Sequence, residues 1–318
     1  MKSFTVTRQD DGQRLNRFLE NVVPSLYPSM MYKYLRIKRI KVNNKKAEGS
    51  TRLSEGDVVE LYISDDFFTG TKSSPDFMKA SSKLTFIYQD DNIALIYKPA
   101  GILTHDDKSE NRDTLINRFL RYLYEHNEYE SNTGESFTPA LCNRLDRGTS
   151  GIVIAAKNSS SLREMNKIIK LRMIKKHYLA IVTSKPPADG IYSAYLIKDE
   201  KNNTVSVMQR AVIGAKSIIT GLRTISKNNG LYLVEVDLIT GRTHQIRAHL
   251  RFLGCPILGD GKYGDGRVNR KFGLTRQALA CYKVTFELDA EENDFPVLFY
   301  LNNRSFEIKS NWFVDEYF

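Results

Sequence analysis

Residues 143–151 read Asn-Arg-Leu-Asp-Arg-Gly-Thr-Ser-Gly and lead directly into the apolar segment 152–156, Ile-Val-Ile-Ala-Ala. The apolar run predicts a buried strand, and Gly148 and Gly151 allow a tight, irregular backbone just before it. Asp146 is therefore expected on a rigid support at the edge of a sheet. Taken alone, an aspartate in such a turn more often caps nearby backbone N–H groups than takes part in catalysis.

Two segments further along the chain change that balance. Residues 175–179, Lys-Lys-His-Tyr-Leu, open a predicted strand after a long helical segment. Residues 240–250, Thr-Gly-Arg-Thr-His-Gln-Ile-Arg-Ala-His-Leu, predict a helix with Thr243 as its N-cap and Arg247 one turn in. This run is dense in polar groups, which are costly to bury without partners. Such a run after a strong strand favours a site over a solvated surface helix.

The chain beyond residue 83 is dominated by short apolar and alternating segments. Predicted strands cover 84–88 and 93–98, with a turn at 89–92 between them, and then 151–157, 177–183, 191–197, 204–208, 216–226, 232–240, 282–288 and 304–308. A helix is predicted over 161–174, and residues 109–138 predict a helix plus a charged loop without an assigned role. Many strands with few helices predict an α+β domain on a large, mostly antiparallel or mixed sheet.

Residues 1–63 predict a second, small α/β domain. Its expected elements are a helix over 13–22, a helix over 30–38, a hairpin over 40–47 and a closing strand over 58–63. Pro28-Ser29 offers a stop and a new N-cap between the helices, and Asn43-Asn44 is the expected hairpin turn. Residues 64–82 are rich in Gly, Pro and Ser and predict a linker, so the large domain spans 83–318.

The charge balance indicates a polyanionic partner. The chain has 47 Lys and Arg against 37 Asp and Glu, a net charge of +10. Residues 1–63 hold 12 basic and 7 acidic residues, which is half of that excess. Five cations in the acid-free run beside Tyr32 and Tyr34 are candidate RNA contacts: Lys33, Arg36, Lys38, Arg39 and Lys41. The alternative is a solvated cationic face that binds nothing.

Cysteine and hydropathy patterns exclude several classes of protein. The three cysteines, Cys142, Cys255 and Cys281, are far apart and form no CxxC pair, which argues against a disulfide scaffold or a zinc ribbon. The N-terminus has no apolar signal-peptide core, and no stretch reaches the about 18 apolar residues that span a bilayer. We expect a cytoplasmic monomer without a membrane partner. His244 and His249, five residues apart, do not form a helical metal motif, and no metal is expected.

The motifs together resemble a known family of enzymes. RLDRGTSG at 144–151, KKHYLAIV at 175–182 and GRTHQIRAHLRFLGCPILGDGKYGD at 241–265 look like the RluA-type pseudouridine synthase family (the RluA, RluC and RluD group). YKPAGILTH at 97–105 is similar to a segment that precedes the family's catalytic motif. The resemblance covers about residues 84–290 and implies the pseudouridine synthase fold with a central RNA-binding cleft.

Residues 12–63 resemble the ribosomal-protein-S4-like RNA-binding domain, through RLNRFL, YKYLRIKRIKVNNKKA and LSEGDVVEL. That pattern is loose and by itself supports only an RNA-binding module.

The enzyme resemblance implies roles residue by residue. Asp146 matches the catalytic aspartate, and Arg247 matches the arginine that pairs with it. Tyr178 matches the tyrosine that stacks on the target base and is proposed to remove its proton. Arg144 matches the arginine that enters the RNA stack when the uridine flips out. Arg242 and His244, in the same motif as Arg247, are expected to contact RNA; no metal or organic cofactor is implied.

The implied reaction suits a carboxylate. The bond between uracil N1 and ribose C1′ breaks, C5 bonds to C1′, and the C5 proton is lost. A carboxylate such as Asp146 can serve as nucleophile, as base or by stabilising positive charge on C1′, and the sequence leaves these three open. Large-subunit ribosomal RNA is the expected substrate, with transfer RNA as the alternative. A non-catalytic RNA-binding assembly factor is the competing function.

Overall fold

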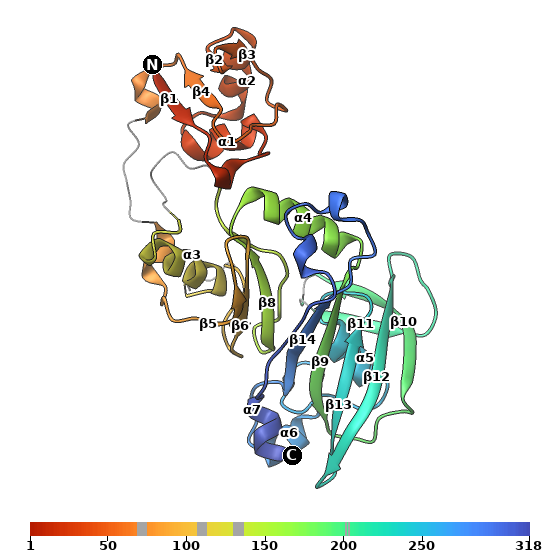
Figure 1. Ribbon diagram of the computed structural model, residues 1–318. Coiled ribbons are helices and arrows are strands. Elements are labelled where there is room, and N and C mark those ends of the chain that lie inside the picture. Colours follow the sequence, from red (N-terminus) through yellow and green to blue (C-terminus); the bar gives the residue numbers. More distant parts are fainter. Residues whose placement is uncertain (69–74, 107–112, 130–136, 201, 203) are drawn as a thin grey trace.

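The computed structural model describes residues 1–68, 75–106, 113–129, 137–200, 202 and 204–318. These residues form two β-sheets, each with its own hydrophobic core (Figure 1). Parts of the expected linker and of the expected charged loop lie outside the described residues. The small N-terminal sheet and its helices lie at one end of the molecule, next to α4 (Ser159–Lys170).

The N-terminal unit is a four-stranded antiparallel sheet with two helices. Its elements are β1 (Lys2–Thr5), α1 (Leu15–Val22), α2 (Pro28–Arg36), β2 (Ile40–Val42), β3 (Lys45–Lys46) and β4 (Val58–Leu61), and the strand order is β1-β4-β2-β3. Asn43 and Asn44 both have left-handed backbones (φ 50° and 60°), as a two-residue hairpin turn requires. The predicted hairpin is confirmed.

Two local details of this unit differ from the sequence prediction. The N-cap of α2 is Tyr27, and Ser29 lies inside the helix, because Pro28 takes the first helical position where its missing N–H costs nothing. Strand β1 was not predicted; its short stretch pairs with β4 from Lys2 to Thr5.

The large sheet has eleven strands. They are β5 (Thr85–Gln89), β6 (Ile93–Lys98), β7 (Ala140–Leu141), β8 (Ser150–Ala156), β9 (Ile174–Val182), β10 (Gly190–Asp199), β11 (Thr204–Met208), β12 (Lys216–Asn228), β13 (Leu231–Leu238), β14 (Leu279–Phe286) and β15 (Ser305–Glu307). The main order is β11-β10-β12-β13-β9-β14-β8-β6-β5, with β15 on β14 and β7 on β8. Every pairing is antiparallel except β8 with β14, which confirms the predicted α+β class.

Helices cover this sheet and its edges. Besides α4 they are α3 (Leu115–Glu125), α5 (Gln245–Phe252), α6 (Gly266–Lys271) and α7 (Trp312–Tyr317). Short 3₁₀ helices are η1 (Arg8–Asp10), η2 (Asp65–Phe68), η3 (Asp76–Lys79), η4 (Glu292–Asp294) and η5 (Phe299–Leu301). The sequence did not predict α6 or α7.

The start of α5 corrects a prediction. Thr243 is not its N-cap; His244 holds that position in a left-handed backbone (φ 52°, ψ 18°) and makes no side-chain cap. The side chain of Gln245 instead satisfies the preceding loop, because its Oε1 accepts from the Arg242 backbone N–H at 3.1 Å. A left-handed histidine is uncommon, and such conformations gather at functional sites.

Gly151 explains how β8 and β14 pair in parallel at the centre of the sheet. Its φ is +124°, and a Cβ there would lie 2.3 Å from the Cys281 carbonyl oxygen. Only glycine permits that approach. At Gly148 a Cβ would lie 2.7 Å from Oε1 of Gln277, so that side chain would have to shift. The predicted irregular backbone is thus found at Gly151, and it fixes the loop that carries Asp146.

Candidate active site

A cavity of about 340 Å³ opens over the middle of the large sheet. Its walls come from the loop before β8, from Tyr178 on β9, Leu238 on β13 and Leu279 on β14, and from the start of α5. Asp146 and Arg247, which lie 101 positions apart in the sequence, meet there. The cavity lies over the centre of the large sheet, where the sequence predicts a central cleft.

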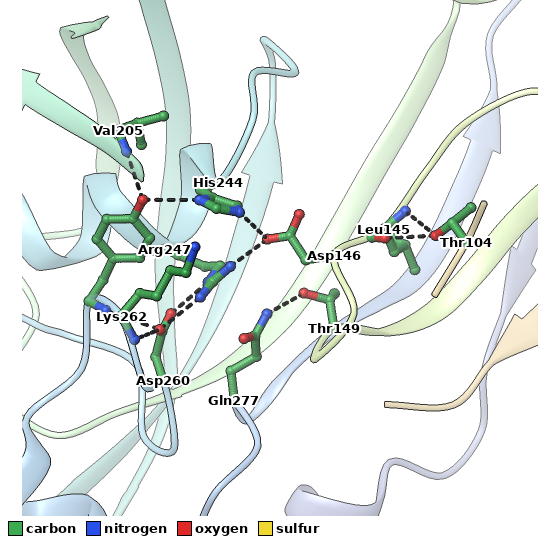
Figure 2. A network of polar contacts seen from close by, with 11 residues as sticks. Thr104, Leu145, Asp146, Thr149, Val205, His244, Arg247, Asp260, Lys262 and Gln277 are labelled. Atoms are coloured by element: carbon green, nitrogen blue, oxygen red, sulfur yellow. Dashed lines mark hydrogen bonds and ion pairs between the residues drawn. The ribbon is translucent and has the colours of Figure 1, made fainter. Parts of the chain in front are cut away.

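Asp146 is part of a three-residue charged network (Figure 2). Arg247 Nη1 donates to Asp146 Oδ2 at 2.7 Å. The other edge of the guanidinium grips Asp260, with Nε to Oδ2 at 2.7 Å and Nη2 to Oδ1 at 2.9 Å. The side chains of Asp260 and Arg247 are 0% and 8% exposed, whereas that of Asp146 is 24% exposed. One carboxylate therefore anchors the arginine, and the other faces the cavity.

The network keeps its charges in the folded protein. Burial alone lowers the pKa of Arg247, but the hydrogen bonds and charge of Asp260, and then Asp146, raise it above its ordinary value. Burial raises the pKa of Asp260, but Arg247 and the backbone N–H groups of Tyr263 and Lys262 together lower it. A guanidinium held bidentately has a fixed direction. Its remaining Nη1 is therefore aimed at Asp146.

The turn around Asp146 is closed by backbone and not by its side chain. The Thr149 N–H donates to the Asp146 carbonyl oxygen at 3.1 Å. Within the described residues the Asp146 carboxylate accepts no nearby backbone N–H, and its hydrogen bond goes to Arg247. The interpretation of Asp146 as an ordinary turn-capping aspartate therefore does not fit the structure.

Lys98 supports the loop that carries Asp146. Its side chain is fully buried, and Nζ donates to the carbonyl oxygens of Ile102 (2.8 Å), Pro99 (3.1 Å) and Arg147 (3.2 Å). Burial lowers the pKa of Lys98 to about 7, and the charge of Asp146 opposes that shift. No role was predicted for Lys98 from the sequence. A charged lysine at the end of the otherwise apolar segment 93–98 was the feature that could have indicated one.

Hydrogen bonds from two side chains, Thr104 and Gln277, fix the loop on either side of Asp146 (Figure 2). Thr104 Oγ1 donates to the Leu145 carbonyl oxygen at 2.7 Å and accepts from the Leu145 N–H at 3.2 Å. On the other side, Gln277 Nε2 donates to Thr149 Oγ1 at 2.6 Å. These contacts leave the Asp146 backbone little freedom, which is what a preorganised catalytic group requires.

Tyr178 forms part of the cavity wall. It is 5% exposed and lies opposite Cys281 in the β9–β14 pairing. Burial, then Cys281 and Asp146, raise the pKa of Tyr178 well above its ordinary value, so the phenol keeps its proton at neutral pH. Cys281 is fully buried, and burial raises the pKa of its thiol to about 11, so it is a core residue.

The other predicted site residues divide into two places. Arg144, Arg242 and His244 line the cavity that holds Asp146. The N-terminal candidates do not line it; they lie on the small domain, where all are exposed except the half-buried Lys41: Lys33, Arg36, Lys38, Arg39 and Lys41. Tyr32 is 52% exposed beside Arg36, whereas Tyr34 is half-buried against Phe67.

A second cavity of about 460 Å³ adjoins the first and shares Lys176 and Arg242 with it. Lys170 and Arg172 also line it, and among the described residues none of these four cations forms an ion pair. Cations without carboxylate partners around a hollow surface suit an anionic ligand. The sequence analysis did not single out Lys170, Arg172 or Lys176.

Asp260 and Tyr263 are further site residues that the sequence analysis left without a role. They lie in the glycine-rich part of the motif at 241–265. Asp260 anchors Arg247, and the Tyr263 hydroxyl oxygen lies 3.0 Å from Nδ1 of His244. His244 Nε2 in turn lies 3.8 Å from Asp146 Oδ2. An aspartate between glycines gives no local sign of a partner 13 residues away.

The described parts of the chain hold no group of three or more His, Cys, Asp or Glu side chains that could bind a metal ion. Each of their helices is also too short or too polar to cross a bilayer.

Solved structures define the class of protein to which this fold belongs. The chain is similar to the human RNA pseudouridylate synthase domain containing 4 protein, with a TM-score of 0.55 and 23% identity over 72% of this chain and 89% of that one. It is also similar to the human domain containing 1 protein, with a TM-score of 0.53 and 20% identity over 77% and 96%. The large domain has the pseudouridine synthase fold.

Sequence comparison gives the family. Residues 92–252 match the family model described as RNA pseudouridylate synthase. The chain is 33% identical over 301 residues to an uncharacterized RNA pseudouridine synthase of Mycoplasma genitalium, covering 93% of this chain and 92% of the relative. It is 35% identical over 267 residues to ribosomal large subunit pseudouridine synthase C of Rickettsia bellii, covering 81% and 84%. The chain belongs to the RNA pseudouridine synthase family, of the RluA type, and is an RNA pseudouridine synthase.

Proposed function

We propose that the enzyme isomerises uridines in large-subunit ribosomal RNA and that Asp146 is its catalytic carboxylate. One observation carries the proposal: the Asp146 carboxylate faces the central cavity and is held by an arginine that Asp260 locks in place. The choice of RNA is supported by the Rickettsia bellii relative, whose name states a large-subunit ribosomal substrate.

The surroundings of Asp146 suit the chemistry of this isomerisation. The base must leave C1′ through N1 and return through C5, with loss of the C5 proton, so no oxidant, reductant or water is consumed. An ionised carboxylate beside the sugar is the group that the reaction needs. Arg247 donates to the Asp146 carboxylate at 2.7 Å and so holds it beside the cavity. We accordingly propose that the enzyme uses no metal or organic cofactor.

Base flipping would bring the uridine into the cavity. Tyr178 offers an aromatic face there, and stacking on such a face contributes about 1–3 kcal/mol per base. Because its raised pKa keeps the phenol protonated, we assign Tyr178 to packing against the base and not to removing a proton. Arg144 is exposed and lines the cavity, so its guanidinium can fill the gap that the flipped base leaves.

Two cationic surfaces would bind the rest of the RNA. The second cavity, with Lys170, Arg172, Lys176 and Arg242, adjoins the catalytic one and would take the phosphates that flank the target. We propose that residues 1–63 are an S4-like RNA-binding domain, joined by 64–82 to a catalytic domain over 83–318. Its exposed cations from Lys33 to Lys41 would bind a more distant part of the RNA.

Tritium release tests the proposed function. RNA labelled at uridine C5 is incubated with the wild type, with Asp146→Asn and with Asp289→Asn, a matched control whose exposed carboxylate lines neither cavity. We expect release from large-subunit ribosomal RNA by the wild type and the control but not by Asp146→Asn. Release from transfer RNA alone would overturn the substrate, and equal release by Asp146→Asn would overturn the catalytic assignment.

A further inference from the structure

A line of hydrogen-bonding groups joins the edge of the large sheet to Asp146. The backbone N–H of Val205 on β11 donates to the Tyr263 hydroxyl oxygen at 2.8 Å. That oxygen lies 3.0 Å from His244 Nδ1, and His244 Nε2 points toward Asp146 Oδ2 at 3.8 Å (Figure 2). The proposed function gives Asp146 a role but leaves this line unexplained.

The line fixes where the imidazole carries its proton. The Tyr263 oxygen already accepts from Val205, and within the described residues the acceptor in reach of its hydroxyl proton is His244 Nδ1. We assign the hydroxyl as the donor to Nδ1, which places the proton of a neutral imidazole on Nε2, the nitrogen that faces the Asp146 carboxylate. Burial, the largest cause, lowers the pKa of His244, so the ring is neutral at neutral pH.

The backbone supports a role beyond packing. His244 adopts the left-handed conformation at the N-cap of α5 without capping the helix through its side chain. Its side chain is 9% exposed and lines the catalytic cavity. An uncommon backbone that aims a side chain with a fixed tautomer at a carboxylate is the kind of strain that functional sites retain.

The spacing of the two groups selects their ligand. At 3.8 Å, the Nε2–H donor and the Oδ2 acceptor are too far apart to bond each other. A hydroxyl oxygen about 2.8 Å from both would accept from Nε2–H and donate to the carboxylate, because a hydroxyl is donor and acceptor on one atom.

The target nucleotide offers such a hydroxyl at the right place. A carboxylate positioned for bond breaking at C1′ lies next to C2′ and its 2′-hydroxyl. The uracil N3–H and O4 edge also pairs a donor with an acceptor, but it lies on the side of the ring away from the N1–C1′ bond. The 2′-hydroxyl is also the group by which a protein distinguishes RNA from DNA.

We infer that His244, held in its Nε2–H form by Tyr263, binds the 2′-hydroxyl of the target uridine together with Asp146 and so selects ribose over deoxyribose. The inference rests on the proposed function, because it places the target sugar beside Asp146.

A substrate and protein double-mutant cycle tests it. The probes are synthetic stem–loop oligonucleotides that carry the uridine converted by the wild type, with ribose, 2′-deoxyribose or 2′-fluororibose at that one nucleotide. Each competes, unlabelled, in initial-rate conversion of the tritiated ribose form. We expect the wild type to prefer ribose about tenfold or more, and His244→Ala to lower that preference about fivefold, the worth of one hydrogen bond. Equal preference in both proteins would overturn the inference.

Tyr263→Phe provides a variant that keeps the histidine. It removes the hydroxyl proton while preserving the ring over which Arg247 lies, with 5.2 Å from the guanidinium carbon to the ring centroid. We expect the ¹⁵N shifts of His244 to report Nε2–H in the wild type and a mixture of tautomers in Tyr263→Phe, with a smaller ribose preference. An Nδ1–H form in the wild type would contradict the inference even if His244→Ala fails to fold.

These outcomes separate the two proposals. If the wild type converts the ribose oligonucleotide but His244→Ala keeps its full ribose preference, the proposed function stands and this inference falls. If His244→Ala binds the ribose, deoxyribose and fluororibose oligonucleotides more weakly by the same factor, His244 contacts the base and not the sugar. That result would also overturn this inference. If the wild type releases tritium from no RNA, both fall.

Discussion

The molecule has two clusters of charge that differ in burial and in partners. Beside the central cavity, Arg247 and Asp260 are almost fully buried, and each charge has a fixed partner. On the N-terminal domain, five cations lie at the surface, and none pairs with a carboxylate among the residues that the structure describes: Lys33, Arg36, Lys38, Arg39 and Lys41.

The difference separates chemistry from binding. A buried, fully paired network has its geometry set before the substrate arrives, which is what stabilisation of a reacting centre requires. Exposed and unpaired cations attract a polyanion over a distance, and that attraction weakens steeply with salt. Changes in the first cluster should therefore alter folding and the chemical step, and changes in the second should alter affinity alone.

The largest effect is expected at Arg247. Arg247→Ala leaves two carboxylates in the cavity without their cation, which typically costs about 3–5 kcal/mol when a pair is buried. Arg223→Gln is the matched control, because that arginine is 65% exposed in its pair with Glu235, and the loss of such a surface pair should cost far less stability. Urea unfolding measures both. Equal small losses would show that the buried network adds little to stability.

Substitution of Gly151 tests whether the backbone that supports Asp146 is as firmly fixed as the ion pairs around it. Gly151→Ala places a Cβ 2.3 Å from the Cys281 carbonyl oxygen at φ +124°, so we expect a loss of about 2–5 kcal/mol. Gly190→Ala is the control, since nothing lies within 4 Å of its Cβ. Thermal melting of the two variants should differ clearly. Similar melting temperatures would contradict the close approach of β8 and β14.

His249 extends the comparison to an uncharged buried group behind the cavity. Its Nδ1 lies 3.0 Å from Thr220 Oγ1, and burial lowers its pKa to about 4. Below its ordinary pKa of about 6.5 the unfolded chain binds a proton that the folded chain refuses until about pH 4. Stability should therefore fall as pH falls through this window, by at most about 3 kcal/mol from this residue.

Replacing His249 should remove that part of the acid sensitivity. Unfolding free energies measured between pH 7 and pH 4 should depend less on pH in His249→Asn than in the wild type. His126→Asn, at an exposed histidine, should keep the wild-type slope. The same slope in all three proteins would show that His249 is not the group responsible.

The smallest effect on the protein itself is expected on the N-terminal face. Neutralising Lys38, Arg39 and Lys41 to Gln should leave stability and the rate at saturating RNA unchanged. The concentration of RNA needed for half-maximal rate should rise about tenfold. The slope of log binding constant against log salt concentration should flatten by up to about 2–3, near one unit per lost phosphate contact. An unchanged salt slope would make these residues a solvated face with no ligand.

The sequence predicted some parts of this architecture better than others, for physical reasons. Regular periodicity reports burial, so the helix α4 and the strands β5, β6 and β8 to β14 were found with errors of a few residues at their ends, whereas the short strand β7 was not predicted. The hairpin at Asn43-Asn44 was found because both residues tolerate the left-handed backbone. The motifs around Asp146 and Arg247 identified the family and brought together the residues that share the cavity.

The sequence did not predict which side chains from separate segments contact each other. The roles of Lys98 and Asp260 depend on the fold, which brings Lys98 under the loop of Asp146 and Asp260 against Arg247. Thr243 was the natural choice of N-cap by residue type, yet the left-handed His244 took that place. Helix-capping propensity depends on residue type alone, so it does not predict that the His244 side chain lines the cavity.

The central claim is that Asp146 performs chemistry whereas the N-terminal cations only bind RNA. The single-turnover rate at saturating ribosomal RNA, with enzyme in excess, removes differences in affinity and so measures chemistry alone. The account predicts that Asp146→Asn lowers this rate by about 10²–10⁴-fold or more, while the Lys38, Arg39 and Lys41 variant stays within about twofold of the wild type. An Asp146→Asn rate within tenfold of the wild type would contradict it.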